Sequence, residues 1–138
     1  MMIEGLSHIT LIVKDLKRTT DFLIRIFDAK EIYESAEKKY SYSKEKYFLI
    51  NGLWFAIMEG KPLSEKTYDH VALKVSEIDF EKYEERVRSS GVDVLEGRPR
   101  INGEGKSLDF YDYDNHLFEL HTGTLDQRLD IYKGKSTI

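Results

Sequence analysis

Two histidines and one glutamate are the residues of this sequence whose types and spacing best fit metal chemistry. His8 and His70 occupy two segments that read alike, and Glu119 lies in a third segment near the C-terminal end. Two imidazoles and a carboxylate form a favourable donor set for a divalent first-row metal ion. Three protein ligands would leave coordination positions open for a substrate.

The two histidine segments, residues 6–13 and 68–75, have the pattern of β-strands. From the histidine onward, both read histidine, β-branched residue, small residue, leucine, any residue and valine. Because side chains alternate between the two faces of a strand, the apolar residues can face a helix while His8 and His70 lie on the opposite face. If two such sheets curl toward each other, the histidines can converge with Glu119.

The last predicted strand places Glu119 opposite its apolar neighbour Phe118. His116 has the opposite parity to Glu119, so we interpret it as structural. His121 is in phase with Glu119, and we expect it to orient a metal ligand rather than to bind the metal. Alignment of the two repeats places Ala56 at the position of Glu119. Alanine cannot bind a metal, so this position would be open for direct binding of substrate.

Each half of the chain reads as a strand, a helix and about three further strands. The first helix is expected after Asp15, a candidate N-cap. Its apolar stripe comprises Phe22, Leu23, Ile26 and Phe27. The second helix is expected between Ser76, which resembles a capping box with Asp79, and Gly91, a candidate C-terminal glycine. Its apolar stripe comprises Phe80, Tyr83 and Val87.

The remaining segments complete an α+β fold. The strands expected after the helices are residues 30–34, 40–43, 46–50, 53–58, 92–95, 107–111 and 116–121. Asn51-Gly52 and Asp114-Asn115 are candidate hairpin turns, and residues 60–66 are a candidate linker. A last helix is expected over residues 125–132, with a frayed tail beyond Gly134. The sequence therefore predicts a single domain, residues 1–138, with two βαβββ repeats at about 5–60 and 67–123, which form a cupped mixed sheet around a metal site.

Composition restricts the class of protein. The 138 residues are 41% hydrophobic and carry a formal net charge of −4 without a basic stripe, so no nucleic acid partner is expected. The sequence has no cysteine, which excludes disulfides and thiolate ligands and favours a cytoplasmic location. No apolar run is long enough to span a bilayer, so no membrane association is expected.

The chain resembles the vicinal-oxygen-chelate (glyoxalase/bleomycin-resistance/dioxygenase) superfamily and, within it, the FosX-type fosfomycin-resistance epoxide hydrolases. The matching stretches are residues 5–16, 43–50, 52–54, 98–100, 103–107 and 114–121. The first reads Gly-Leu-Ser-His-Ile-Thr-Leu-Ile-Val-Lys-Asp-Leu, and the last reads Asp-Asn-His-Leu-Phe-Glu-Leu-His. The resemblance implies metal-dependent hydration of fosfomycin, a small anionic epoxide, to a diol, which confers antibiotic resistance.

The resemblance also implies roles for individual residues. The implied metal ligands are His8, His70 and Glu119, with Mn(II) or another divalent ion as the metal. Glu45 is the implied general base and Thr10 a catalytic residue beside the metal, although Glu45 stands between two lysines and reads as solvated without the resemblance. The implied substrate-binding residues are Ser107, Arg128, Trp54, Tyr68 and Arg100. Related thiol transferases place the metal ligands across two subunits, which implies a homodimer.

One position departs from the family pattern. Asp109 stands where the family usually has a tyrosine that contacts the phosphonate, and Tyr111 is in phase to replace it. A carboxylate there would repel a phosphonate unless it is paired or turned away. Two alternative functions stay open. One is a fosfomycin thiol transferase of the same superfamily, against which the carboxylate of Glu45 argues. The other is a metal-free drug-binding protein, in which His8 and His70 would be dispensable.

Overall fold

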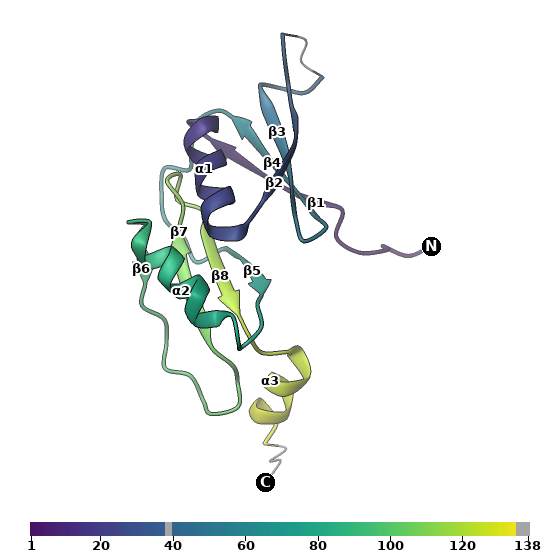
Figure 1. Ribbon diagram of the computed structural model, residues 1–138. Coiled ribbons are helices and arrows are strands. Elements are labelled where there is room, and N and C mark those ends of the chain that lie inside the picture. Colours follow the sequence, from purple (N-terminus) through teal and green to yellow (C-terminus); the bar gives the residue numbers. More distant parts are fainter. Residues whose placement is uncertain (38–39, 135–138) are drawn as a thin grey trace. The chain divides into compact units, whose positions relative to one another are not determined.

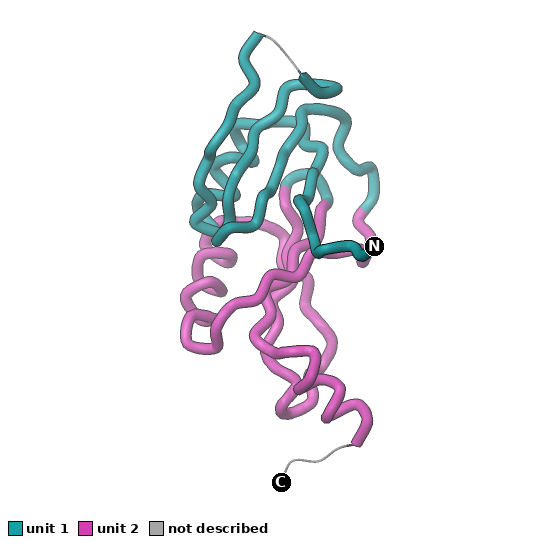
Figure 2. The backbone as a smooth tube through the Cα atoms, turned by 90° about the vertical axis from the view of Figure 1, so that its right-hand side faces the viewer, with its two compact units in different colours: residues 1–65, 113–115 teal, residues 66–112, 116–138 magenta. Residues whose placement is uncertain are grey.

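The computed structural model describes residues 1–37 and 40–134 (Figure 1). The elements in chain order are β1 (His8–Val13), α1 (Leu16–Phe27), β2 (Lys30–Glu34), β3 (Glu45–Ile50), β4 (Leu53–Glu59), β5 (His70–Lys74), α2 (Phe80–Ser89), β6 (Val94–Leu95), β7 (Ser107–Tyr111), β8 (Leu117–His121) and α3 (Leu125–Tyr132). They divide into two compact units, coloured separately in Figure 2. Unit 1 comprises residues 1–65 and 113–115, and unit 2 comprises residues 66–112 and 116–138.

Each unit contains one four-stranded mixed sheet with the same topology. The strand order is β1-β4-β3-β2 in unit 1 and β5-β8-β7-β6 in unit 2. The first strand of each repeat pairs in parallel with the last, and the other pairs are antiparallel. The expected α+β fold with two βαβββ repeats is confirmed.

The helix α1 begins where its sequence signal predicts. The side chain of Asp15 accepts a hydrogen bond from the backbone N–H of Arg18 at 3.1 Å. The helix ends at Asp28, whose left-handed backbone (φ 55°) terminates the helical hydrogen bonding. The expected apolar stripe is buried, and α1 packs against β3 and β4. Burial of this stripe fixes which face of the sheet is covered, and so leaves His8 on the other face.

The start of α2 differs from the prediction. Ser76 Oγ accepts the N–H of Asp79 at 3.2 Å, but the Asp79 side chain makes no capping bond and instead accepts the Ser76 hydroxyl at 2.9 Å. The reciprocal capping box is therefore wrong, because the two side chains bond to each other. At the other end, Gly91 (φ 76°) directly follows the C-cap residue, as predicted. Phe80 and Val87 are buried.

Several strand predictions need correction. Residues 40–43 form bends and no strand, because the exposed Tyr40 and Tyr42 bury little apolar surface there. The strand β6 is limited to two residues, and β8 starts one residue later than expected, because the N–H of His116 is bonded to the Asp112 side chain at 2.9 Å.

Other local predictions are confirmed. Asn51 and Gly52 both have positive φ, as a tight hairpin turn between β3 and β4 requires. The helix α3 has the predicted bounds and begins with a reciprocal capping box between Thr124 and Gln127. The expected frayed tail, residues 135–138, lies outside the described residues. None of the helices in residues 1–37 and 40–134 is long and apolar enough to cross a membrane.

Candidate metal and anion site

The sheet of unit 2 brings two of the three predicted metal ligands together. Ala72 on β5 lies opposite Glu119 on β8, so His70, two residues before Ala72, shares a face with Glu119. His70 Nε2 lies 3.4 Å from Glu119 Oε1. Two ligand atoms bound at right angles to one ion, each at about 2.1 Å, would be about 3 Å apart, so the pair fits a first-row metal.

The ring of His70 is held in the tautomer that a metal requires. His70 Nδ1 lies 2.7 Å from the carbonyl oxygen of Tyr68, and the Tyr68 ring lies 4.8 Å from the imidazole centre. A carbonyl oxygen can only accept, so Nδ1 donates to it, and Nε2 is the ring nitrogen that faces Glu119. Tyr68, predicted as a pocket residue, therefore also orients a ligand.

Glu119 is buried and is oriented by two further side chains. Ser107 Oγ donates to Glu119 Oε2 at 3.1 Å and lies 2.7 Å from His121 Nδ1. Because the serine proton is given to Glu119, His121 donates from Nδ1. The geometry thus agrees with the orienting role predicted for His121. Ser107 was predicted to hold the phosphonate, and a bound anion would have to compete for this hydroxyl.

The third predicted ligand, His8, lies in unit 1. The hydroxyl of Ser7 lies 2.9 Å from His8 Nδ1, and the His8 ring stacks on Trp54 at 4.1 Å. His8 Nε2 is therefore the nitrogen left for a metal. In the described part of unit 2, no further His, Asp or Glu completes a three-ligand metal group around His70 and Glu119.

The face of the unit 1 sheet that carries His8 also carries the predicted general base. Thr10 lies opposite Ala56, Ala56 lies opposite Tyr47, and Glu45 lies two residues before Tyr47 on β3. The pairing of Thr10 with Ala56 matches that of Ala72 with Glu119 in unit 2, so the assignment of Ala56 as the counterpart of Glu119 is confirmed.

Glu45 is 5% exposed, and this is the opposite of what its two lysine neighbours indicate. Lys46 lies on the other face of the strand and pairs with Glu31 at 3.0 Å, so it does not neutralise Glu45. Tyr47 is hydrogen-bonded to the Glu45 carboxylate, and this bond raises the pKa of the Tyr47 phenol. Tyr47 was not predicted from the sequence, although its parity with Glu45 was visible.

Both predicted substrate-binding arginines, Arg100 and Arg128, lie around a buried carboxylate in unit 2. Arg100 Nη1 donates to Glu104 at 3.2 Å, and Arg128 Nε lies 3.8 Å from the same carboxylate. Arg128 Nη2 also lies 3.5 Å from His121 Nε2. Burial lowers the pKa of His121, and the positive charges of Arg128 and Arg100 lower it further. The negative charge of Glu119 acts in the opposite direction. The arrangement is suited to an anion.

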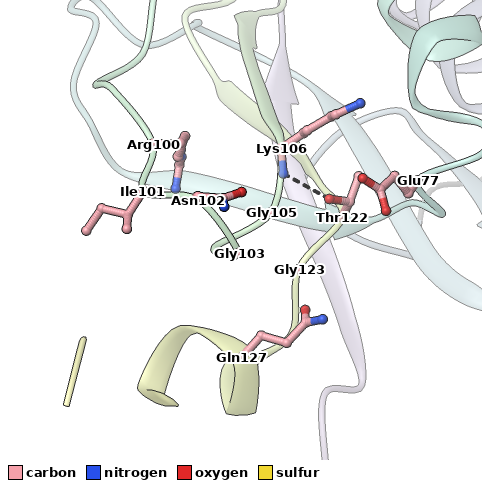
Figure 3. A pocket seen from close by; sticks show the side chains of 10 residues that line it. All are labelled: Glu77, Arg100, Ile101, Asn102, Gly103, Gly105, Lys106, Thr122, Gly123 and Gln127. Carbon is pink, nitrogen blue, oxygen red and sulfur yellow. Dashed lines mark hydrogen bonds between the residues drawn. The ribbon is translucent and has the colours of Figure 1, made fainter. Parts of the chain in front are cut away.

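The loop that carries Arg100 borders a pocket of about 390 Å³ (Figure 3). Its lining includes Arg100, Lys106, Glu77 and Gln127, and the backbone N–H of Lys106 donates to Thr122 Oγ1 at 2.9 Å. Arg100 also lines a second pocket, of about 230 Å³, together with Ser107 and Asp109. Arg100 thus borders both pockets, and in the second pocket it lies beside Ser107 and Asp109 on β7.

Asp109 lies on this polar face, directly opposite Glu119. It is 4% exposed, and its Oδ1 has no hydrogen-bond partner among the described residues. Burial, reinforced by the charge of Glu119, raises the pKa of the Asp109 carboxyl. Tyr111 was predicted to replace the missing tyrosine, but its hydroxyl donates to the carbonyl of Thr67 at 3.3 Å.

Two further polar side chains, those of His116 and Trp54, differ in their hydrogen bonding. His116 Nδ1 bonds to the Asp112 carboxylate at 2.8 Å, which agrees with the structural role predicted for His116. The indole N–H of Trp54 is buried without a partner in the described residues. An unpaired buried donor costs free energy, so it marks a place where a ligand atom would be stabilising.

Known proteins similar to this chain indicate its family. The chain is 58% identical over 131 residues to the fosfomycin resistance protein FosX of Listeria monocytogenes, covering 95% of this chain and 98% of that protein. It is 38% identical over 136 residues to the metallothiol transferase FosB of Staphylococcus saprophyticus, with 96% and 85% coverage. Its structure matches a crystal structure of a FosX variant from Listeria monocytogenes in complex with Mn(II) and 1S,2S-dihydroxypropylphosphonic acid. That match has a TM-score of 0.85, 57% identity, and covers 95% of this chain and 99% of the other.

A family model matches residues 5–120, which span both βαβββ repeats and all three predicted metal ligands. The chain belongs to the glyoxalase/bleomycin resistance protein/dioxygenase superfamily.

Proposed function

We propose that the chain is a FosX-type enzyme that hydrates the epoxide of fosfomycin to a diol in a metal-dependent reaction, and so confers resistance to this antibiotic. The observation that carries the proposal is the pairing of His70 Nε2 with Glu119 Oε1 at 3.4 Å, in the same unit as an arginine cluster suited to a phosphonate. The 58% identity with a FosX protein over nearly the whole chain supports the same activity.

Mn(II) is the metal of this proposal, because FosX from Listeria monocytogenes has been crystallised with Mn(II) and a dihydroxypropylphosphonic acid. His70 and Glu119 supply two ligands, and His8 supplies the third, from the same chain or from a second copy. When bound, the metal supplies Lewis acidity that stabilises negative charge on the epoxide oxygen as the ring opens.

Glu45 removes a proton from the attacking water. The water oxygen forms a bond to an epoxide carbon while the bond from that carbon to the ring oxygen breaks, and the ring oxygen is protonated afterwards. A buried carboxylate hydrogen-bonded to Tyr47 is held in one orientation, as a general base must be. Glu45 lies on the same face of the unit 1 sheet as Thr10 and the proposed metal ligand His8.

The substrate is held by its phosphonate and its apolar carbons. Arg100 and Arg128 provide charge-assisted hydrogen bonds to the phosphonate, and Ser107 provides a hydroxyl. Trp54 contributes an unpaired indole N–H and an aromatic surface beside His8. Thr10 contacts the substrate from the position next to His8 on the same strand face.

The proposal includes a homodimer and a cytoplasmic location. A dimer offers a second source for His8, which unit 2 lacks and which the metal set requires. A sequence without cysteine suits a reducing compartment.

A thiol transferase is the second candidate, because the chain is 38% identical to FosB, a metallothiol transferase. The buried Glu45 disfavours it, since a thiol nucleophile needs no carboxylate base at that position. A metal-free drug-binding protein is disfavoured by the orientation of His70, which leaves Nε2 free beside Glu119.

Phosphorus NMR of fosfomycin incubated with the protein distinguishes the three functions. Parallel samples contain metal-free protein, Mn(II)-loaded protein, and Mn(II)-loaded protein with glutathione. The proposed function predicts diol in both Mn(II) samples and none in the metal-free sample. A product that appears only with glutathione would assign a transferase, and fosfomycin that binds but remains intact would assign a binding protein.

A further inference from the structure

Glu104 is a fully buried carboxylate that the hydration reaction does not use. It is 0% exposed and lies in the glycine-rich loop Asn102-Gly-Glu-Gly105. Both of its oxygens accept hydrogen bonds from Arg98, one of them at 3.2 Å, and the backbone N–H of Ile101 donates to it at 3.0 Å. The Tyr132 hydroxyl from α3 also donates to it. A carboxylate buried with so many donors has a fixed position.

The same carboxylate contacts both arginines assigned to the phosphonate. Arg100 reaches it through Nη1 at 3.2 Å and Arg128 through Nε at 3.8 Å. Their side chains are 20% and 34% exposed, so each is half-buried but reaches solvent. Arg128 continues toward His121, which is bonded to Ser107 beside Glu119. Glu104 is therefore fully buried next to two arginines that reach solvent.

The charges in this cluster indicate why the carboxylate is needed. Three guanidinium groups converge on one carboxylate, and like charges in a half-buried region repel one another. Arg98 uses two nitrogens on Glu104, in a fork that fixes it there. Arg100 and Arg128 approach through one nitrogen each, and a guanidinium has five N–H groups, so donors are left to bind an anion.

The backbone of the loop that carries Glu104 lies in close contact with the segment that leads into α3. A Cβ atom built on Gly105 would lie 2.7 Å from the backbone nitrogen of Gly123, and one built on Gly123 would lie 2.5 Å from the carbonyl oxygen of Glu104. Only glycine fits at these two positions, so the loop crosses the segment between β8 and α3 at close contact. Glu104 is thereby tied both to Arg100 on its own loop and to Arg128 on α3.

We propose that Glu104 is a positioning residue that holds Arg100 and Arg128 together as a preformed binding site for the phosphonate of the substrate. The identity of the anion rests on the proposed function. Arg100 and Arg128 repel each other, and Glu104 offsets this repulsion before the substrate binds. Binding therefore does not have to supply the free energy that brings the two cations together.

The test measures anion binding separately from turnover. Calorimetry gives the affinity of the Mn(II)-loaded protein for methylphosphonate, and phosphorus NMR gives KM and kcat for fosfomycin. For Glu104→Gln, methylphosphonate affinity is expected to fall about tenfold or more, with a similar rise in KM, while kcat and Mn(II) affinity change less than about threefold. Absence of fosfomycin turnover in the wild type would refute the proposed function, and the methylphosphonate affinities would still decide the role of Glu104.

Tyr132→Phe is the matched control. It removes one hydrogen bond to the same carboxylate without changing any charge. Methylphosphonate affinity is expected to stay within about threefold of wild type, because Glu104 keeps both arginines. A loss in Glu104→Gln that is no larger than the loss in Tyr132→Phe would overturn the proposal, because stability alone would then account for it.

Two further variants keep the proposal testable. Glu104→Asp retains the charge and the fold but withdraws the carboxylate by one methylene, so an intermediate loss of methylphosphonate affinity is expected, and wild-type affinity would overturn the proposal. In an Arg100→Gln background, Glu104→Gln is expected to cost less affinity than in the wild type, because part of its effect acts through Arg100. An equal loss in both backgrounds would also overturn it.

Discussion

Replacement of Asp109 by asparagine is expected to stabilise the metal-free protein. The carboxylate is 4% exposed, lies directly opposite Glu119 on the neighbouring strand, and has one oxygen without a hydrogen-bond partner in the described residues. Like charges that face each other across two strands are destabilising, and burial of an unpaired carboxylate adds to the cost. Asparagine has the same shape and no charge, so the substitution removes the repulsion and the burial of a charge, and leaves a neutral polar group in the same place.

The expected magnitude follows from the facing charges of Asp109 and Glu119. A cross-strand charge pair contributes about 0.2–1 kcal/mol. Relief of this repulsion would raise the midpoint of thermal unfolding by roughly 1–4 °C, at about 4 °C per kcal/mol for a chain of this length. The loss of a negative charge is also expected to tighten methylphosphonate binding, since the two anions repel each other across the anion site.

The assay is thermal and urea unfolding at neutral pH of protein stripped of metal, because a carboxylate beside Glu119 also attracts a cation. Asp112→Asn is the control with the same chemical change and the opposite expectation. Asp112 accepts bonds from both the N–H and Nδ1 of His116, at 2.9 and 2.8 Å, so its replacement should destabilise by about 1–3 kcal/mol. An unfolding midpoint of Asp109→Asn below that of wild type would refute the reasoning.

Three other predictions concern the general base Glu45, the metal ligand Glu119 and the buried carboxylate Glu104. Glu45→Gln should bind Mn(II) and methylphosphonate normally, as measured by electron paramagnetic resonance and calorimetry, while diol formation falls about 10²- to 10⁴-fold; normal turnover would remove Glu45 from the mechanism. Glu119→Ala should lose both Mn(II) binding and diol formation, and tight retention of Mn(II) would contradict the ligand set. Glu104, whose pKa is lowered chiefly by Arg98, binds a proton less readily when folded than when unfolded. The ionised Glu104 therefore stabilises the folded protein fully at pH values above its ordinary pKa of 4.5, and this stabilisation is lost as the pH falls. The difference in free energy of unfolding between wild type and Glu104→Gln should shrink between about pH 5 and pH 3.

Local signals in the sequence predicted the framework of the site well. The helix α3 has the expected bounds because Thr124 and Gln127 form a cap from neighbouring residues, and α1 begins after Asp15 for the same reason. The parity of His70 and Glu119 was also correct, since alternation along a strand is fixed by backbone geometry. These features depend on residues a few positions apart, which a single sequence displays directly.

The burial of individual charges could not be predicted in the same way. Glu45 lies between two lysines, and only the pairing of β3 with β4 shows that it is buried while Lys46 points to the other face. The strand expected at residues 40–43 does not form, because its aromatic side chains are exposed and bury little apolar surface.

The role of Glu104 in the loop 102–105 could not be predicted from the sequence. The contacts of Glu104 with Arg128 and Tyr132 join positions more than twenty residues apart, which no local pattern reveals. An acidic residue between two glycines, preceded by Arg98 and Arg100, was the available signal for a buried ion pair.

The most direct test of the account is a single-turnover reaction in water enriched in oxygen-18, with Mn(II)-loaded protein in excess over fosfomycin and the product analysed by mass spectrometry. Direct attack by a water molecule activated by Glu45 predicts a diol that carries one oxygen-18 atom after the first turnover, and no diol from metal-free protein. An unlabelled diol, in which the new oxygen comes from a protein carboxylate, or equal diol formation without the metal would contradict it.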